Sequence, residues 1–573
     1  MKIRILSSIA LGALIATAPF AASAKPTLPP AAAIPTPVPT PVTPPVPTVA
    51  PGYKAPDIPP TNADIVGVTQ QPFVGISLEN AIGMALLKNP NLSVAASNTR
   101  VATYQVQQAK GANDVHFFVE PSVKHDTNPA LNAFFSGGTD FQPYVQNYQT
   151  QEAGVQGQFE TGTQYNINVS QSKVNDSTYI NSFNPYYYGS FNVSITQPLL
   201  KNFLMNDDKR QIQLSMVNND ATQASTLATV STTISSVEDA YWDLLAAWRN
   251  LAIQEDALRQ TVLQQQSNVR QAKRGYAAPI DAVESSTQVA VYQQNVFSAL
   301  QTVSELQNQL KSLIVTDPGD PIWEANLVPT SPAVLSLPQT PSVGSLLAAA
   351  MQNRPEVRQA LDAQKQADVN RAYAKNQLLP QADLQLAYNG NGFAGNALPP
   401  LGGVFGTATP PPYYDGAYGQ AFANSGRFST YSAALQVSVP IGNNTAKGAL
   451  GVADEQAHIA AVQKLGTAER IQYEVRNAVQ TYQAALARLF AAREAREASA
   501  QVLASEERKF RNGESTTFLI NQRQVEFVQN QGLELQAQTD LNKAVVELQR
   551  VDGSILTANN VSLGTLGQGA LKP

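Results

Sequence analysis

Apolar residues recur at alternating steps of three and four in two long stretches of the chain. The first series comprises Leu227, Val230, Ile234, Val237, Tyr241, Leu244, Trp248 and Leu251. The second comprises Ile471, Val475, Ala478, Tyr482, Ala485 and Leu489. This spacing is typical of helices that pack as coiled coils. Each stretch is almost free of Pro and Gly and runs for roughly 65–70 residues, which predicts helices about 100 Å long.

Four other segments alternate apolar and small polar residues, a pattern that predicts β-strands. Their apolar positions are Tyr165, Ile167 and Val169; Phe191, Val193 and Ile195; Leu384, Leu386 and Tyr388; and Leu435, Val437, Val439 and Ile441. One apolar and one polar face is typical of a membrane barrel wall, although an ordinary half-buried sheet alternates in the same way. Two or three hairpins cannot close a barrel, so several chains must share one.

Three segments between these strands are rich in Gly, Asn, Pro, Tyr and Ser. They are residues 126–150, 173–188 and 389–428. We expect them to be long loops on one side of the sheet.

The body of the chain also repeats itself. AIGMALLKNPNL (81–92) aligns with LLAAAMQNRPEV (346–357), so that Asn89-Pro90 matches Arg354-Pro355. Each unit continues with strands, a very long helix, a Gly-bearing turn and another long helix. This order predicts an internal two-fold repeat, with one unit at 61–325 and the second at 326–573, where it ends in a C-terminal tail.

The N-terminus has the features of a secretory signal peptide. Lys2 and Arg4 precede an apolar run, and Ala22-Ser23-Ala24 provides a cleavage site after residue 24. A membrane anchor is the alternative, but the run is shorter than the ~20 residues that span a bilayer. Residues 25–60 are rich in Pro, Ala and Thr, which predicts an extended linker.

Composition argues against several classes of function. Charged residues make up 14% of the chain and the net charge is −5, so nucleic acid is not an expected partner. There is no Cys, and the three histidines (His116, His125 and His458) have no partners near them in the sequence. We therefore expect no catalytic, cofactor or metal site, and no enzymatic activity.

The order of these features resembles the TolC-like outer-membrane efflux proteins, over about residues 61–565. The resemblance is carried by the two helix starts at Pro90 and Pro355 and by four further phrases: Leu378–Gln381, Thr196–Leu200, Arg274–Asp281 and Arg511–Leu519. It implies a mixed α and β membrane protein. Three chains would share an antiparallel β-barrel of twelve strands in the outer membrane. A long α-helical coiled-coil barrel would continue it into the periplasm, girdled by residues 316–345 and 551–573.

The sequence departs from this family in one respect. An additional alternating hairpin lies at about 152–172, with its turn at Thr161-Gly162, so the chain offers six strands where the family has four. The extra pair either extends a hairpin beyond the membrane or enlarges the barrel. We expect extension.

The resemblance also implies a function, that of an exit duct in a tripartite efflux or type I secretion system. The expected partners are two further copies of the chain, outer-membrane lipid, a periplasmic adaptor and an inner-membrane pump. The residues expected at the adaptor-docking tips are Gly275, Tyr276, Pro279, Gly513, Glu514 and Ser515. Those expected at the periplasmic gate are Phe510, Arg511, Leu519, Gln522 and Arg523.

Two other classes of protein share part of this pattern. A trimeric coiled-coil surface adhesin would also have long heptads and a small shared barrel, but its helices would not turn back at glycines. A secreted enzyme would need a catalytic site, for which the sequence offers no candidate. Ion conductance distinguishes a duct from an adhesin.

Overall fold

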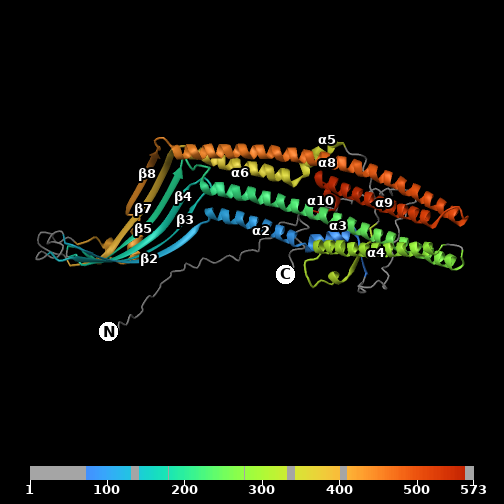
Figure 1. Cartoon of the computed structure of the whole chain (residues 1–573). Coiled ribbons are helices and arrows are strands. Elements are labelled where there is room, and N and C mark those ends of the chain that lie inside the picture. The colour runs from blue at the N-terminus through green and yellow to red at the C-terminus, as the bar shows by residue number, and fades with distance from the viewer. Residues whose placement is uncertain are drawn as a thin grey trace, which may run out of the picture. The chain divides into compact units, whose positions relative to one another are not determined.

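A computed structural model describes residues 73–130, 141–178, 180–275, 278–331, 342–399 and 409–561. The expected signal peptide (1–24), the linker (25–60) and Tyr276 lie outside these ranges. The described part consists of long helices joined to one antiparallel sheet (Figure 1).

The two longest helices are α3 (Asp207–Lys273) and α8 (Asn444–Arg511), of 67 and 68 residues, which makes each about 100 Å long. The heptad positions behave as the sequence predicts. All six residues of the second series are buried, and so are all of the first except the half-buried Leu227. α4 (Pro279–Ile314) and α9 (Thr517–Val551) run back along α3 and α8 respectively and pack against them.

Near the sheet, four helices lie side by side in the order α2 (Pro90–Lys110), α3, α6 (Pro355–Gln377), α8 (Figure 1). Polar contacts join each neighbouring pair. The hydroxyl groups of Thr99 and Thr226 are 2.9 Å apart between α2 and α3. Arg210 of α3 donates to Asn370 of α6 at 3.3 Å, and an ion pair of 2.6 Å joins α6 to Asp454 of α8. These helices therefore form a continuous wall.

Short elements surround the middle of the long helices. They are α1 (Leu78–Lys88), α5 (Val343–Asn353), α10 (Ile555–Ala558) and a parallel pair of strands, β1 (Phe73–Ile76) with β6 (Asn326–Pro329). Tyr241 of α3 donates to the Ile76 carbonyl at 3.1 Å, and Trp248 donates to the Leu327 carbonyl at 2.9 Å. Both side chains are buried in the main hydrophobic core. The girdle expected around 316–345 thus includes a small sheet held to α3.

One sheet contains six antiparallel strands in the order β2-β3-β4-β5-β7-β8. Its strands are β2 (His116–Asn128), β3 (Tyr144–Gln158), β4 (Gln164–Asp176), β5 (Phe183–Pro198), β7 (Gln381–Ala397) and β8 (Phe428–Ser438). A short helix, α7 (Tyr418–Ala423), packs against β5 and β7. The edges of the sheet within this chain are β2 and β8.

One expectation about the strands is wrong. The segments expected as loops (126–150, 173–188 and 389–428) contain the outer ends of β2, β3, β4, β5 and β7. Part of their Gly, Asn and Tyr residues belong to paired strands, among them Asn147, Tyr186 and Gly390. Gly189, Gly390 and Gly392 lie where α7 and the residues after it cross the sheet closely. An added Cβ at Gly392 would overlap the Ala421 carbonyl, so glycine at this position serves packing.

The additional hairpin turns at Gly162 as expected, with φ of +89°. Its strands β3 and β4 pair with β2 and β5 over almost their full length. The hairpin therefore enlarges the sheet itself.

Candidate functional site

The two faces of the six-stranded sheet differ in chemistry. Directly paired residues project to the same face, so the register defines rows that cross all six strands. One row is apolar throughout and consists of Phe117, Val155, Ile167, Val193, Tyr388 and Tyr431. The next row projects from the opposite face and consists of Phe118, Gly154, Asn168, Asn192, Asn389 and Thr430.

The polar face is held together by hydrogen bonds between side chains of neighbouring strands. Asn192 donates to Asn168 at 2.7 Å, and Gln385 donates to Gln436 at 3.0 Å. In these two pairs amide groups satisfy one another. The same face also carries charged side chains, among them the directly paired Glu120 and Glu152. Such a wall suits contact with lipid on its apolar face and with water on its polar face.

The turn between α3 and α4 contains the first expected tip residues. Gly275 has φ of +75°, and its N–H donates to the Ala272 carbonyl at 3.1 Å. No atom lies within 4 Å of a Cβ added at this position, so backbone conformation alone favours glycine. Pro279 begins α4, where its missing N–H costs no hydrogen bond.

The turn between α8 and α9 also has a left-handed glycine, and it has one further backbone hydrogen bond. Gly513 has φ of +77° and donates to the Phe510 carbonyl, and the N–H of Glu514 donates to the Lys509 carbonyl at 2.9 Å. This pair of bonds is the Schellman motif that ends helices at glycine. Ser515 donates to the Glu506 carboxylate at 2.5 Å. Each tip thus has an exposed glycine in a left-handed conformation.

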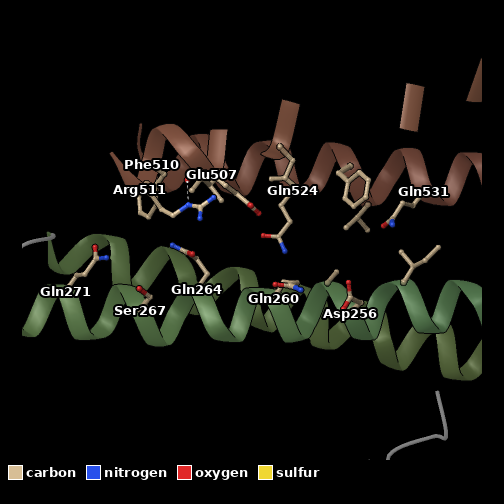
Figure 2. A pocket seen from close by; sticks show the side chains of 16 residues that line it. Asp256, Gln260, Gln264, Ser267, Gln271, Glu507, Phe510, Arg511, Gln524 and Gln531 are labelled. Atoms are coloured by element: carbon tan, nitrogen blue, oxygen red, sulfur yellow. Dashed lines mark hydrogen bonds between the residues drawn. The ribbon is translucent and has the colours of Figure 1, made fainter. Parts of the chain in front are cut away.

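A groove of about 790 Å³ lies behind these tips, between α3 and the α8–α9 pair. Figure 2 shows Gln264 and Gln271 of α3 pointing across it, with Gln524 of α9 pointing back. One hydrogen bond that crosses the groove joins Gln524 to Thr261, and at 3.4 Å it is long. Within the chain, α8 and α9 are therefore separated from α3 by a polar groove at this end.

The structure divides the expected gate residues into two groups. Phe510 and Arg511 line the groove, and Arg511 donates to the Glu507 carbonyl at 3.3 Å (Figure 2). Leu519 and Gln522 are exposed and do not line the groove. Arg523 pairs with Glu526 at 2.8 Å on the surface of α9. Phe510 and Arg511 lie on α8. On α9 the residues that face the groove include Ile520 and Gln524, and the sequence offered no means of fixing the phase of α9 at the turn.

Sequence reasoning missed two groups of charged residues on the helices. Arg354, whose side chain is 2% exposed, bonds to Glu356 and to Glu474 of α8. Glu238 of α3 is also buried and accepts from Asn559 at 2.9 Å. Burial raises the pKa of Glu238 to about 7 and that of its neighbour Asp239 to about 6. Polar residues within the buried face of a predicted helix are the signal that could have found Glu238.

We expect Glu238→Gln to raise stability at pH 8 and to change it little at pH 5. The folded pKa lies above the unfolded value, so the native state binds more protons between about pH 4.5 and 7 and becomes less stable as pH rises. Glutamine keeps the acceptor for Asn559 and removes the charge. The expected gain at pH 8 is about 1–3 kcal/mol. Thermal melting followed by circular dichroism at both pH values measures it.

Glu305→Gln is the matched control, because it makes the same change at an exposed position of α4. It should leave the melting temperature unchanged at both pH values. Equal gains for Glu238→Gln at pH 5 and pH 8 would show that this carboxyl group does not titrate in the neutral range.

The three histidines lie on β2 and α8. His116 begins β2, His125 of β2 contacts Asn147 at 2.6 Å, and His458 is on α8. The described ranges contain no group of three or more His, Cys, Asp or Glu side chains that could hold a metal ion. Within the same ranges, no helix combines the length and apolar character needed to cross a membrane.

Comparison with solved structures agrees with this architecture. The chain matches a membrane protein from Pseudomonas aeruginosa over 88% of its own length and 97% of that chain, with a TM-score of 0.58 and 16% identity. It matches the CmeC outer membrane channel of Campylobacter jejuni over 85% and 90%, with a TM-score of 0.57 and 12% identity. It matches the open state of the Neisseria gonorrhoeae MtrE outer membrane channel over 89% of its own length and 98% of that chain, with a TM-score of 0.55 and 17% identity.

The chain has the fold of an outer-membrane channel. No protein-family model matches the sequence, and no curated protein matches it. At 12–17% identity the likeness concerns backbone architecture, so the roles of individual residues rest on the geometry described above.

Proposed function

We propose that this protein is the outer-membrane exit duct of an efflux or type I secretion system. One observation carries the proposal: a sheet with an apolar and a polar face continues into a wall of helices about 100 Å long. The sheet fits the outer membrane, and helices of this length fit the periplasm. The shared fold with outer-membrane channels supports the same conclusion.

The duct requires more than one chain. The free edges at β2 and β8 would leave backbone N–H and C=O groups without partners in lipid, where each such group is costly. Three copies arranged in a ring would pair these edges and close a common barrel. The matching order of helices and strands at 78–314 and 343–551 supports the internal two-fold repeat within each chain.

The partners are assigned from the direction of the helices. Both long pairs turn back at an exposed glycine at the end opposite the sheet (Figure 1). These tips would meet a periplasmic adaptor bound to an inner-membrane pump. The groove between α3 and the α8–α9 pair would let that pair move when the duct opens. An adhesin stalk has no need for helices that turn back.

Light scattering with correction for bound detergent, together with conductance in planar bilayers, tests the duct. We expect a trimer that conducts ions once its periplasmic end is open. A trimer without conductance in any state would favour the adhesin. A stable conducting monomer would contradict the shared barrel.

We expect the purified channel to resist block by a trivalent cation added from the periplasmic side. Leu519 and Gln522 are exposed, uncharged and three residues apart on α9, so they share one face of the helix. Without a carboxylate ring, the constriction should close by packing and dewetting. Leu519→Asp with Gln522→Asp should create block at micromolar to millimolar concentration. Strong block of the unmodified channel would place acidic residues, such as Glu514, Asp281 or Glu284, at the gate.

A further inference from the structure

We infer that all six strands of each chain enter the membrane wall, so that three copies form a barrel of eighteen strands instead of twelve. The inference rests on the proposed function, because it takes the sheet to be a barrel segment. Its first support is strand length. β3 has 15 residues and β4 has 13, within the range of the other four strands and above the roughly 9–11 that cross a bilayer.

The second support is the apolar face, which continues across the part of the additional hairpin nearest the helices. Further out, the same face of the hairpin pairs Gln151 with Gln171 and Gln149 with Lys173. Val155 of β3 and Ile167 of β4 lie in the row that joins Phe117 of β2 to Val193 of β5. On the opposite face, Asn168 of the hairpin bonds to Asn192 of β5. A hairpin in water would not need an apolar face in register with the apolar face of its neighbours.

The third support is the anchoring of the hairpin turn at the junction between strands and helices. Gln158 donates to Asp208, in the first turn of α3, at 2.8 Å, and the N–H of Leu204 donates to the Thr161 carbonyl at 3.2 Å. A Cβ added at Gly162 would lie 2.6 Å from the Asn202 carbonyl oxygen. The hairpin therefore begins at the same level as the other strands and is held against them.

The fourth support is the width of the helical wall below the sheet. Four helices, α2, α3, α6 and α8, continue β2, β5, β7 and β8. Helices about 10 Å apart give an arc of about 40 Å. Six strands about 4.8 Å apart and tilted by about 40° span about 38 Å, whereas four span about 25 Å. The six-stranded sheet thus matches the width of the helices that carry it.

The even number of strands also permits closure. β2 runs away from the helices and β8 runs towards them, so β8 of one copy meets β2 of the next as an antiparallel pair. By the same spacing and tilt, eighteen strands give a ring about 36 Å across between backbones, and twelve give about 24 Å. The outer part of this duct would admit bulkier hydrophilic solutes than a twelve-stranded one.

Single cysteines test the inference directly, because the chain has none of its own. Ile167→Cys and Asn168→Cys on the hairpin, each carrying a bimane fluorophore, are reconstituted as assembled protein in phosphatidylcholine vesicles. We expect doxyl-labelled lipid to quench the fluorophore at 167 at least twofold more than the one at 168, and aqueous iodide to show the reverse preference. Val193→Cys and Asn192→Cys on β5 are the matched controls.

The outcomes separate the two proposals. Lipid quenching at 193 with only aqueous quenching at 167 would overturn the eighteen-stranded barrel and leave the duct in place. Aqueous quenching without lipid quenching at both 167 and 193 would overturn the membrane barrel itself. Lipid quenching at both, with iodide access at 168 and 192, is the result expected.

A deletion variant tests the width of the barrel. Deletion of residues 145–176 removes almost all of β3 and β4 and lets β2 pair with β5. Poly(ethylene glycol) of graded size, added on the extracellular side of a planar bilayer, should reach a cut-off diameter about one third smaller than in the intact protein. An unchanged cut-off in a conducting, trimeric deletion variant would show that the hairpin does not widen the pore. If the variant fails to assemble, the cysteine result decides.

Discussion

Replacement of Arg354 by Met should destabilise the protein by about 3 kcal/mol, the lower end of the range for removing one partner of a buried ion pair. Its guanidinium donates to Glu356 at 2.9 Å and to Glu474 at 2.5 Å, which joins the start of α6 to the middle of α8. Methionine fills similar space but leaves both carboxylates without this partner. Circular dichroism of the detergent-solubilised protein should show a melting temperature lower by roughly 3 °C.

The difference in stability between Arg354→Met and the wild type should depend on pH. Burial would raise the pKa of Glu356, but the hydrogen bonds from Arg354 outweigh burial and hold it below its ordinary value. A depressed pKa contributes stability above the unfolded pKa of about 4.3 that is lost as pH falls through the folded value. The gap between the variant and the wild type should therefore narrow below about pH 4.

Arg470→Met is the matched control. Arg470 also donates to Glu474, at 2.9 Å, but its side chain is 50% exposed. An exposed pair of this kind contributes less than about 1 kcal/mol. Equal losses for the two variants would mean that burial does not distinguish these two arginines.

The sequence predicts the helices well because their apolar residues are buried within one chain. Val475, Ala478 and Tyr482 are buried within the chain, so the heptad seam appears in the sequence as it appears in the structure. The tips could be located for a similar reason. A left-handed residue between two long helices strongly favours glycine, and Gly275 and Gly513 both have positive φ.

The ends of the strands could not be predicted in the same way. Gly189 and Gly392 are typical of loops in composition, yet here they make room for α7, which is distant from Gly189 in sequence. The role of Arg354 was hidden for the same reason. It marked the repeat as part of an Arg-Pro step, but Glu474 lies 120 residues away along the chain. Local pattern carries no information about such contacts.

The position of the hairpin in the sheet follows from the pairing of its strands and could not be read from the alternation of apolar and polar residues. Ile167 and Val169 alternate with Asn166 and Asn168, which predicts two faces but not which strands lie on either side. The register with β5 supplies that information. The paired backbone places the hairpin inside the sheet, between β2 and β5.

Introducing Trp at either tip, as Gly275→Trp or Gly513→Trp, should abolish export while trimer formation and membrane insertion continue. Nothing lies within 4 Å of a Cβ at either position, so the indole would project into solvent and not into its own chain. It would obstruct an adaptor that docks on the tip. Positive φ adds strain of about 1–2 kcal/mol for any residue other than glycine. That strain is small beside the stability of helices packed along a complete heptad seam.

Two controls separate these effects. Gly275→Ala and Gly513→Ala carry the same backbone strain without bulk, and Gly466→Trp places the same bulk on the shaft of α8, where the space around a Cβ is also open. Export is measured as resistance to a panel of toxic small molecules in a Gram-negative host that produces the protein with its pump, and docking as cross-linking yield to the adaptor. We expect both controls to export normally. Loss of export in the alanine variants would assign the effect to the turn conformation, and normal export in both tip tryptophan variants would show that the adaptor docks elsewhere.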